Sequence, residues 1–175
     1  ITSKDNAKIN TFIALLKGYR RIVRGHFHIK CISDIDRTDY LMIRNFYLLE
    51  RPEIIRASIE ENLLLKEDID VKFLNELLEK IELDNSIAIL DQGLQTTLNS
   101  DGSPLSYKSI LKLEIIRAIL FRPLFLVLTP TFKVFSERER NMIIDLLKEN
   151  RIGVISTCTV SACESFELID LDKES

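Results

Sequence analysis

Several features are scarce in this sequence, and each scarcity excludes a class of protein. Only five Gly and four Pro occur among 175 residues, so the chain is neither collagen-like nor of low complexity. Three Cys without a CxxC pair do not form a disulfide framework, which favours a reducing compartment. The chain shows no signal-peptide pattern, and no apolar run approaches the roughly 20 residues of a membrane-spanning helix. We therefore expect this stretch of chain to be soluble.

An excess of charge of one sign is also lacking. The chain has 24 Lys and Arg residues against 27 Asp and Glu residues, a net charge of -3. Nucleic-acid binders are usually strongly basic, so no nucleic-acid partner is expected. Hydrophobic residues make up 46% and charged residues 29% of the chain, which is a globular composition. A chain of this length fits one domain, or one compact fragment of a larger protein.

Hydrophobic periodicity predicts alternating helices and strands, without a linker or a repeat. The predicted helices are residues 10–17, Pro52–Leu63, Val71–Leu83, 106–121 and a helix after Ser136. The predicted strands are His26–Ile32, the end of residues 41–49, Leu124–Leu128 and residues 153–156. The second half alternates helix and strand, and right-handed crossovers then give a parallel sheet covered by helices.

The second half carries the clearest local signals. Ser106 is a good N-cap, and Ser136 with Glu139 three residues later forms a capping box. Apolar residues lie on most sides of the helix after Ser106, so this helix should be largely buried. The unbroken apolar run Leu124–Leu128 is typical of a central strand in a parallel sheet.

A distinctive order of motifs surrounds these elements. The segment Leu105–Ser109 opens a helix that ends in Arg117–Leu120, and Pro123 and the apolar strand follow. This order resembles the nucleotide-binding domain of ABC transporters, in which the signature LSGGQ opens a helix ending in ARAL, followed by a Pro and the Walker B strand. Further segments match in order: Leu15–Tyr19 with Gly25 after Walker A, Pro52 at the Q-loop, Ser58–Leu63 at the exporter TIRENI element, and Gly93–Thr96 with Asp101 and Gly102 before the signature.

The resemblance covers nearly the whole chain and implies an α/β fold. This fold is a P-loop NTPase-like (ABC ATPase) parallel sheet flanked by helices, with an inserted helical subdomain. Residues 1–175 would form a single nucleotide-binding domain without the family's amino-terminal strands. Its core would comprise residues 1–50 and 121–175, and its helical subdomain about residues 51–120.

The P-loop positions that the resemblance assigns have mostly changed. A phosphate cradle needs glycines, whose backbone N–H groups turn inward, and a Lys that neutralises the phosphates. Ser3 and Lys8 take the two glycine positions, and Ile9 takes the lysine position. Asn10 replaces the Mg²⁺-binding hydroxyl, and only Thr11 matches the family. Lys8, Asn10 and Thr11 are therefore the candidate residues of a degenerate nucleotide-binding loop.

The remaining catalytic motifs have changed as well. Thr129 replaces the Walker B Asp, and Pro130 replaces the Glu that acts as general base, a role worth roughly 10²–10⁴-fold. In the signature, Ser106 is a remnant, whereas Tyr107 and Lys108 replace two glycines. Other altered positions are Glu50 at the Q-loop, Thr157 at the switch histidine and Ser136 at the D-loop Asp. We expect no catalytic residue and no ATP hydrolysis, and no cofactor unless binding of ATP and Mg²⁺ survives.

Three other clusters have simpler explanations. His26, His28 and Cys31 suggest a metal site, but on a strand Cys31 points to the opposite face and no fourth ligand is near, so no metal is expected. Cys158 and Cys163 are expected to be plain thiols, because no activating His is near in sequence. The third cluster is a basic patch made of Lys17, Arg20, Arg21 and Arg24. It is an anion or nucleic-acid contact, a phosphate site displaced from the P-loop, or a solvated helix end.

Three hypotheses for function follow. The first is a catalytically degenerate nucleotide-binding domain with a structural or regulatory role in ATP-driven export. Its partners would be the transmembrane domains of a parent transporter and possibly a second nucleotide-binding domain, on the cytoplasmic side of a membrane, with the isolated domain a monomer. The second is a protein-interaction module without a transport role. The third is an atypical ATPase in which Lys8 or Arg24 replaces the P-loop lysine.

Overall fold

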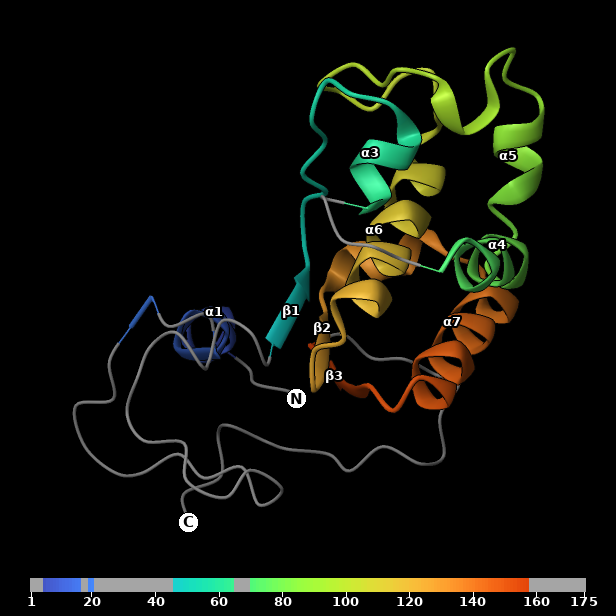
Figure 1. The fold of residues 1–175 in the computed structure, drawn as a ribbon. Coiled ribbons are helices and arrows are strands. Elements are labelled where there is room, and N and C mark those ends of the chain that lie inside the picture. The colour runs from blue at the N-terminus through green and yellow to red at the C-terminus, as the bar shows by residue number, and fades with distance from the viewer. Residues whose placement is uncertain (1–4, 17–18, 21–45, 65–69, 158–175) are drawn as a thin grey trace.

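A three-stranded parallel sheet lies at the centre of the fold, with helices packed against it (Figure 1). Its strands, in spatial order, are β1 (Phe46–Leu49), β2 (Phe125–Leu128) and β3 (Gly153–Ser156). The α/β fold with a parallel sheet that the sequence predicts is therefore confirmed, with β2 as the central strand. The computed structural model describes residues 5–16, 19–20, 46–64 and 70–157.

The side of the sheet that faces the main core follows from strand alternation. Leu49 of β1 lies beside Leu128 of β2 in the ladder, and both are fully buried in one cluster with Leu126. Side chains two residues apart on a strand share a face, so this face is apolar along its length. In Figure 1 the helices α6 and α7 lie on this side of the sheet, and α1 lies on the other.

Helix α6 (Tyr107–Phe121) is the central helix of the core. Its start agrees with the prediction, because the Ser106 hydroxyl accepts a hydrogen bond from the Ser109 N–H at 3.1 Å. It ends at Arg122, whose φ of 53° is left-handed. Nearly all residues from Ser109 to Ile119 are buried, as the continuous apolar pattern predicts.

Helix α7 (Glu137–Glu149) begins at the predicted capping box. The Ser136 hydroxyl accepts from the Glu139 N–H, and the Glu139 carboxylate accepts from the Ser136 N–H at 2.9 Å. These reciprocal bonds satisfy two backbone donors that a helix start otherwise leaves open. The buried side of α7 carries Ile143, Ile144, Leu146 and Leu147.

Within the described residues, helices occupy the chain between β1 and β2. They are α3 (Ile59–Leu64), α4 (Val71–Lys80), α5 (Asp84–Ala88), the short 3₁₀ helix η1 (Gly93–Gln95) and α6. The extended residues Ser58 and Thr97 form a single antiparallel bridge beside them. The division into a core and a helical subdomain of about residues 51–120 stays a prediction.

The predicted helix from Pro52 to Leu63 is wrong over its first half, since the helix begins only at Ile59. Asn62 explains the difference: fully buried, it accepts from the Ile55 N–H at 3.0 Å and donates to the Ile55 carbonyl at 3.0 Å. Ser58 and Glu61 exchange reciprocal cap bonds at the helix start. These side chains replace the backbone bonds that a helix would have made.

Other boundaries differ from the prediction at single caps. Helix α1 (Asn6–Leu16) starts four residues early, because the Asp5 carboxylate accepts from the Ala7 N–H at 2.8 Å. Helix α4 ends at Lys80 and not at Leu83, since Glu82 adopts a left-handed φ of 56°. The predicted strand His26–Ile32 lies outside the described residues.

Candidate nucleotide-binding site

The carboxyl ends of three parallel strands meet at one edge of the sheet, where ligands bind in open α/β folds. The segments after β1, β2 and β3 bring Glu50, Thr129 and Thr157 to this edge, as the motif order implies. The Thr129 hydroxyl donates to the Leu49 carbonyl at 2.7 Å, and the Thr157 hydroxyl donates to the Leu128 carbonyl at 3.2 Å. Threonine side chains therefore tie the three strand ends together.

The two residues directly after β2, Thr129 and Pro130, carry no charge. Thr129 is buried, and Pro130 is exposed at the start of the 3₁₀ helix η2 (Pro130–Val134). The Thr131 hydroxyl donates to the Glu50 carbonyl at 3.2 Å, which adds a further tie across the edge. A carboxylate at these positions would offer a negatively charged ligand to Mg²⁺ or accept a proton, and neither Thr nor Pro carries that charge or acts as a base at neutral pH.

The start of α1 holds the three candidate residues of the degenerate loop. Lys8 and Asn10 are exposed in its first turns, and Thr11 is partly buried. At this helix end the Asp5 carboxylate accepts from the Ala7 N–H at 2.8 Å, and the Asp5 carbonyl accepts from the Lys8 N–H at 3.0 Å. Backbone N–H groups at a helix start are the donors that usually hold a phosphate, and here an anionic side chain caps one of them.

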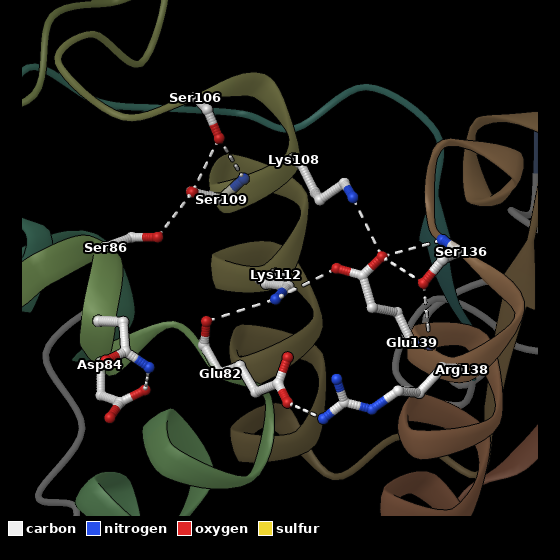
Figure 2. A network of polar contacts seen from close by, with 11 residues as sticks. Glu82, Asp84, Ser86, Ser106, Lys108, Ser109, Lys112, Ser136, Arg138 and Glu139 are labelled. Atoms are coloured by element: carbon white, nitrogen blue, oxygen red, sulfur yellow. Dashed lines mark hydrogen bonds and ion pairs between the residues drawn. The ribbon is translucent and has the colours of Figure 1, made fainter.

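Ser106, the remnant of the signature, acts as a helix cap. Its hydroxyl lies 2.9 Å from the Ser109 hydroxyl, which in turn donates to the Ser86 hydroxyl at 3.3 Å (Figure 2). Figure 1 shows α1 and the first turn of α6 in different parts of the molecule. The structure therefore does not bring Ser106 together with Lys8, Asn10 and Thr11. A site containing both would need two copies of this kind of domain.

Lys108 lies in the first turn of α6 and points toward α7 (Figure 2). Its ammonium donates to Glu139 Oε2 at 3.0 Å, and Lys112 lies 3.5 Å from Glu139 Oε1. Burial raises the pKa of Glu139, but hydrogen bonds from the Ser136 N–H and from Lys108 outweigh it and hold the pKa at about 2. The sequence indicates only that Lys108 crowds the signature, and no local signal pairs it with Glu139.

A buried polar triad links β1 to α6 and was not anticipated from the sequence. The Tyr47 hydroxyl donates to Glu114 Oε1 at 2.6 Å, and Arg117 donates to Glu114 Oε2 at 2.8 Å. Arg117 also donates to the Glu53 carbonyl at 2.6 Å, in the segment after Glu50. Burial raises the pKa of both Glu114 and Tyr47. Two opposite charges three residues apart on a largely buried helix are the signal that would have found it.

No metal centre emerges from the described part of the chain. Its residues include no group of three or more His, Cys, Asp or Glu side chains that would hold a metal ion. The cluster of His26, His28 and Cys31 lies outside the described residues, as do Cys158 and Cys163. Of the basic patch, only Arg20 is described, and it is exposed.

Known proteins with related sequences are transporters. No protein-family model matches the chain. The chain is 29% identical over 116 residues to the SPbeta prophage-derived sublancin-168-processing and transport ATP-binding protein SunT of Bacillus subtilis, covering 65% of the chain and 16% of that protein. Over 128 residues it is 27% identical to ABC transporter B family member 6 of Arabidopsis thaliana, covering 71% and 9%. A probable multidrug resistance ABC transporter ATP-binding/permease protein, YheI of Bacillus subtilis, is 28% identical over 120 residues, covering 66% and 20%.

The fold has a counterpart among solved structures. A bacterial Atm1-family ABC exporter with ATP bound matches with a TM-score of 0.74 and 17% identity, covering 89% of this chain and 28% of that one. These comparisons confirm the predicted resemblance: the chain is similar to the ATP-binding parts of exporter-type ABC transporters and shares their fold. The chain spans between 9% and 20% of the length of the relatives it matches. Among the described residues, no helix is both long and apolar enough to cross a membrane.

Proposed function

We propose that this chain is a catalytically degenerate nucleotide-binding domain with a structural or regulatory role in ATP-driven export. Residues 1–175 of this sequence would form the domain within a longer transporter, on the cytoplasmic side of a membrane. Its partners would be the transmembrane domains of that transporter and possibly a second nucleotide-binding domain. The observation that carries the proposal is the end of β2, where Thr129 donates to the Leu49 carbonyl and Pro130 follows.

The lack of a charged side chain at Thr129 and Pro130 supports a domain that does not hydrolyse ATP. A general base must accept a proton, and a metal-binding carboxylate must carry charge, so Thr129 and Pro130 meet neither requirement. The Thr129 hydroxyl is committed to a backbone carbonyl 80 residues away in sequence. Its bond ties β1 to β2 and gives this position a structural role.

The start of α1 supports weak nucleotide binding. Asp5 places its carboxylate on the Ala7 N–H at the start of the helix, one of the donors that a phosphate there would need. A second anion at the same place would be repelled and would have to displace this cap. Lys8, Asn10 and Thr11 would then contribute little to nucleotide affinity.

Titration calorimetry with MgATP at near-millimolar concentration tests the proposal. The expected result is no measurable heat of binding, together with no phosphate release above the protein-free rate. Tight, magnesium-dependent binding would refute the proposal. If tight binding is found, the variant Lys8→Met is measured next. A loss of tight binding in that variant would assign the phosphate contact to Lys8.

An atypical ATP-binding ATPase is the second candidate, and one observation favours it. Because α1 begins at Asn6, Lys8 lies in the first helical turn, which is where a P-loop lysine reaches its phosphates. Phosphate release that disappears in Lys8→Met would support this candidate. The third candidate, a protein-interaction module without a transport role, predicts a parent protein without transmembrane domains, which sequencing the parent gene would reveal.

A further inference from the structure

Glu139 of α7 is the centre of a network of charges that joins three helices (Figure 2). Its two carboxylate oxygens face two lysines of α6, with Lys108 Nζ at 3.0 Å and Lys112 Nζ at 3.5 Å. These lysines are four residues apart, so they lie one turn apart on the same side of α6. One carboxylate on α7 therefore holds two successive turns of α6.

The network extends from α6 to the end of α4 at Glu82. Lys112 Nζ also donates to the Glu82 carbonyl at 3.3 Å, and Arg138 of α7 pairs with the Glu82 carboxylate. Glu82 has a left-handed φ of 56°, which is uncommon for a residue other than glycine. Contacts from two helices thus hold the residue that ends α4. Lys80 at the end of α4 and Glu149 at the end of α7 form a further ion pair at 2.6 Å.

Exposure separates the strong contacts of this network from the weak ones. The side chains of Lys112 and Glu139 are 8% and 13% exposed, whereas Arg138 is 80% exposed. Exposed ion pairs are screened by solvent and contribute little, but partly buried charges lose more when a partner is removed. The interaction between Lys112 and Glu139 is therefore the strongest of the network, and Lys108, 42% exposed, adds less to it.

We propose that Glu139, Lys108, Lys112, Glu82 and Arg138 form a charge clasp that fastens the end of α4 and the start of α6 to α7. The clasp suppresses separation of these helices, and it turns Lys108 inward to Glu139 and away from any external anion. This conformational role goes beyond the proposed function, because it involves no nucleotide and stands whether or not the chain binds one.

Hydrogen exchange followed by mass spectrometry on the full chain tests the clasp, with the variant Glu139→Gln. A Gln at the third helical position preserves the capping box with Ser136, so the substitution removes the charge and leaves the helix start intact. The matched control is Glu137→Gln, which removes the same charge from the first turn of α7 at an exposed residue without an ion pair in the described structure. A second test variant, Lys108→Gln, changes a side chain that is 42% exposed and is not needed for the core.

Local opening should become easier only where the clasp acts. In Glu139→Gln the amides of residues 77–88 and 137–149 should exchange about tenfold faster, while those of β2 should accelerate by a clearly smaller factor that reflects only the change in global stability. Lys108→Gln should show a smaller increase in the same segments, and Glu137→Gln should stay within about twofold of wild type. Equal rates in Glu139→Gln and Glu137→Gln would overturn the proposal. So would an equal acceleration in β2, because that would make Glu139 a source of global stability and not of local fastening.

Discussion

Gly102 is the single residue on which the approach to α6 depends most. It has a φ of 86°, and a Cβ built there would lie 2.0 Å from Ile110 Cδ1 and 2.8 Å from Ile110 Cγ1. Ile110 is itself buried, 3% exposed, so a shift of its side chain would disturb the packing around it. Backbone conformation and packing both require glycine at this turn, four residues before the Ser106 cap.

Replacement of this glycine should therefore be costly. We expect Gly102→Ala to lower the free energy of unfolding by about 3 kcal/mol, the sum of a left-handed backbone penalty and overpacking against Ile110. Gly93→Ala is the matched control, since Gly93 also has a positive φ of 52° but a Cβ there would meet nothing within 4 Å. Urea unfolding of both variants measures the difference. Equal losses would show that Ile110 accommodates the methyl group without strain.

At the scale of elements, carboxylates at two helix starts and in the turn before α6 contribute to the response to acid. The Ser58 N–H holds the pKa of Glu61 below its usual value, and the Ser103 N–H does the same for Asp101. Glu139, at the cap of α7, has a pKa of about 2. Each of these carboxylates is bound more favourably when ionised, so each stabilises the folded state only while it stays ionised.

The sign of the pH dependence follows from these lowered pKa values. An unfolded Glu titrates at about 4.3, so the contribution of Glu139 is fully present above that pH and is lost as pH falls toward about 2. Urea unfolding between pH 7 and pH 2.5 should show a decreasing stability difference between the wild type and Glu139→Gln. A difference that stays constant over this range would mean that the Glu139 carboxylate is not what titrates.

At the scale of the whole molecule, we do not expect two copies of this chain to associate through a shared nucleotide. In the family that this chain resembles, nucleotide joins the P-loop of one domain to the signature of another. Here Asp5 caps the start of α1, and Lys108 is paired with Glu139, so we expect neither half of that contact to hold a phosphate. Association through the parent transporter would then depend on other surfaces.

Light scattering measures the mass of the chain in solution and so tests whether two copies associate. The isolated chain should have the mass of a monomer, 20.2 kDa, with or without millimolar MgATP. The reason is that a nucleotide shared between two copies would meet the Asp5 carboxylate at the start of α1 and a Lys108 already paired with Glu139, which would leave little electrostatic attraction to hold the copies together. A shift to twice that mass on addition of MgATP would contradict both this prediction and the proposed inactive role. Addition of MgCl₂ without nucleotide is the control.

Local sequence patterns determined β2, β3 and the starts of α6 and α7, and the order in which they follow one another. The continuous apolar run before Thr129 predicted β2 to within one residue, and Ser106 and Ser136 predicted the starts of α6 and α7. These signals succeed because a cap or a buried strand is specified by neighbouring residues alone. The motif order then predicted which residues follow each strand, and parallel pairing places them at one edge of the sheet.

Only the tertiary structure decided the contacts that give these residues their roles. The bonds from Thr129 to Leu49, from Tyr47 to Glu114 and from Lys108 to Glu139 join residues 80, 67 and 31 positions apart. No periodic pattern records such pairs, because they depend on the path of the chain between them and on which faces pack together. The helix predicted from Pro52 was wrong before α3 for the same reason. Buried Asn62 makes side-chain bonds to the Ile55 backbone, and these replace the helical backbone bonds that the apolar pattern had predicted.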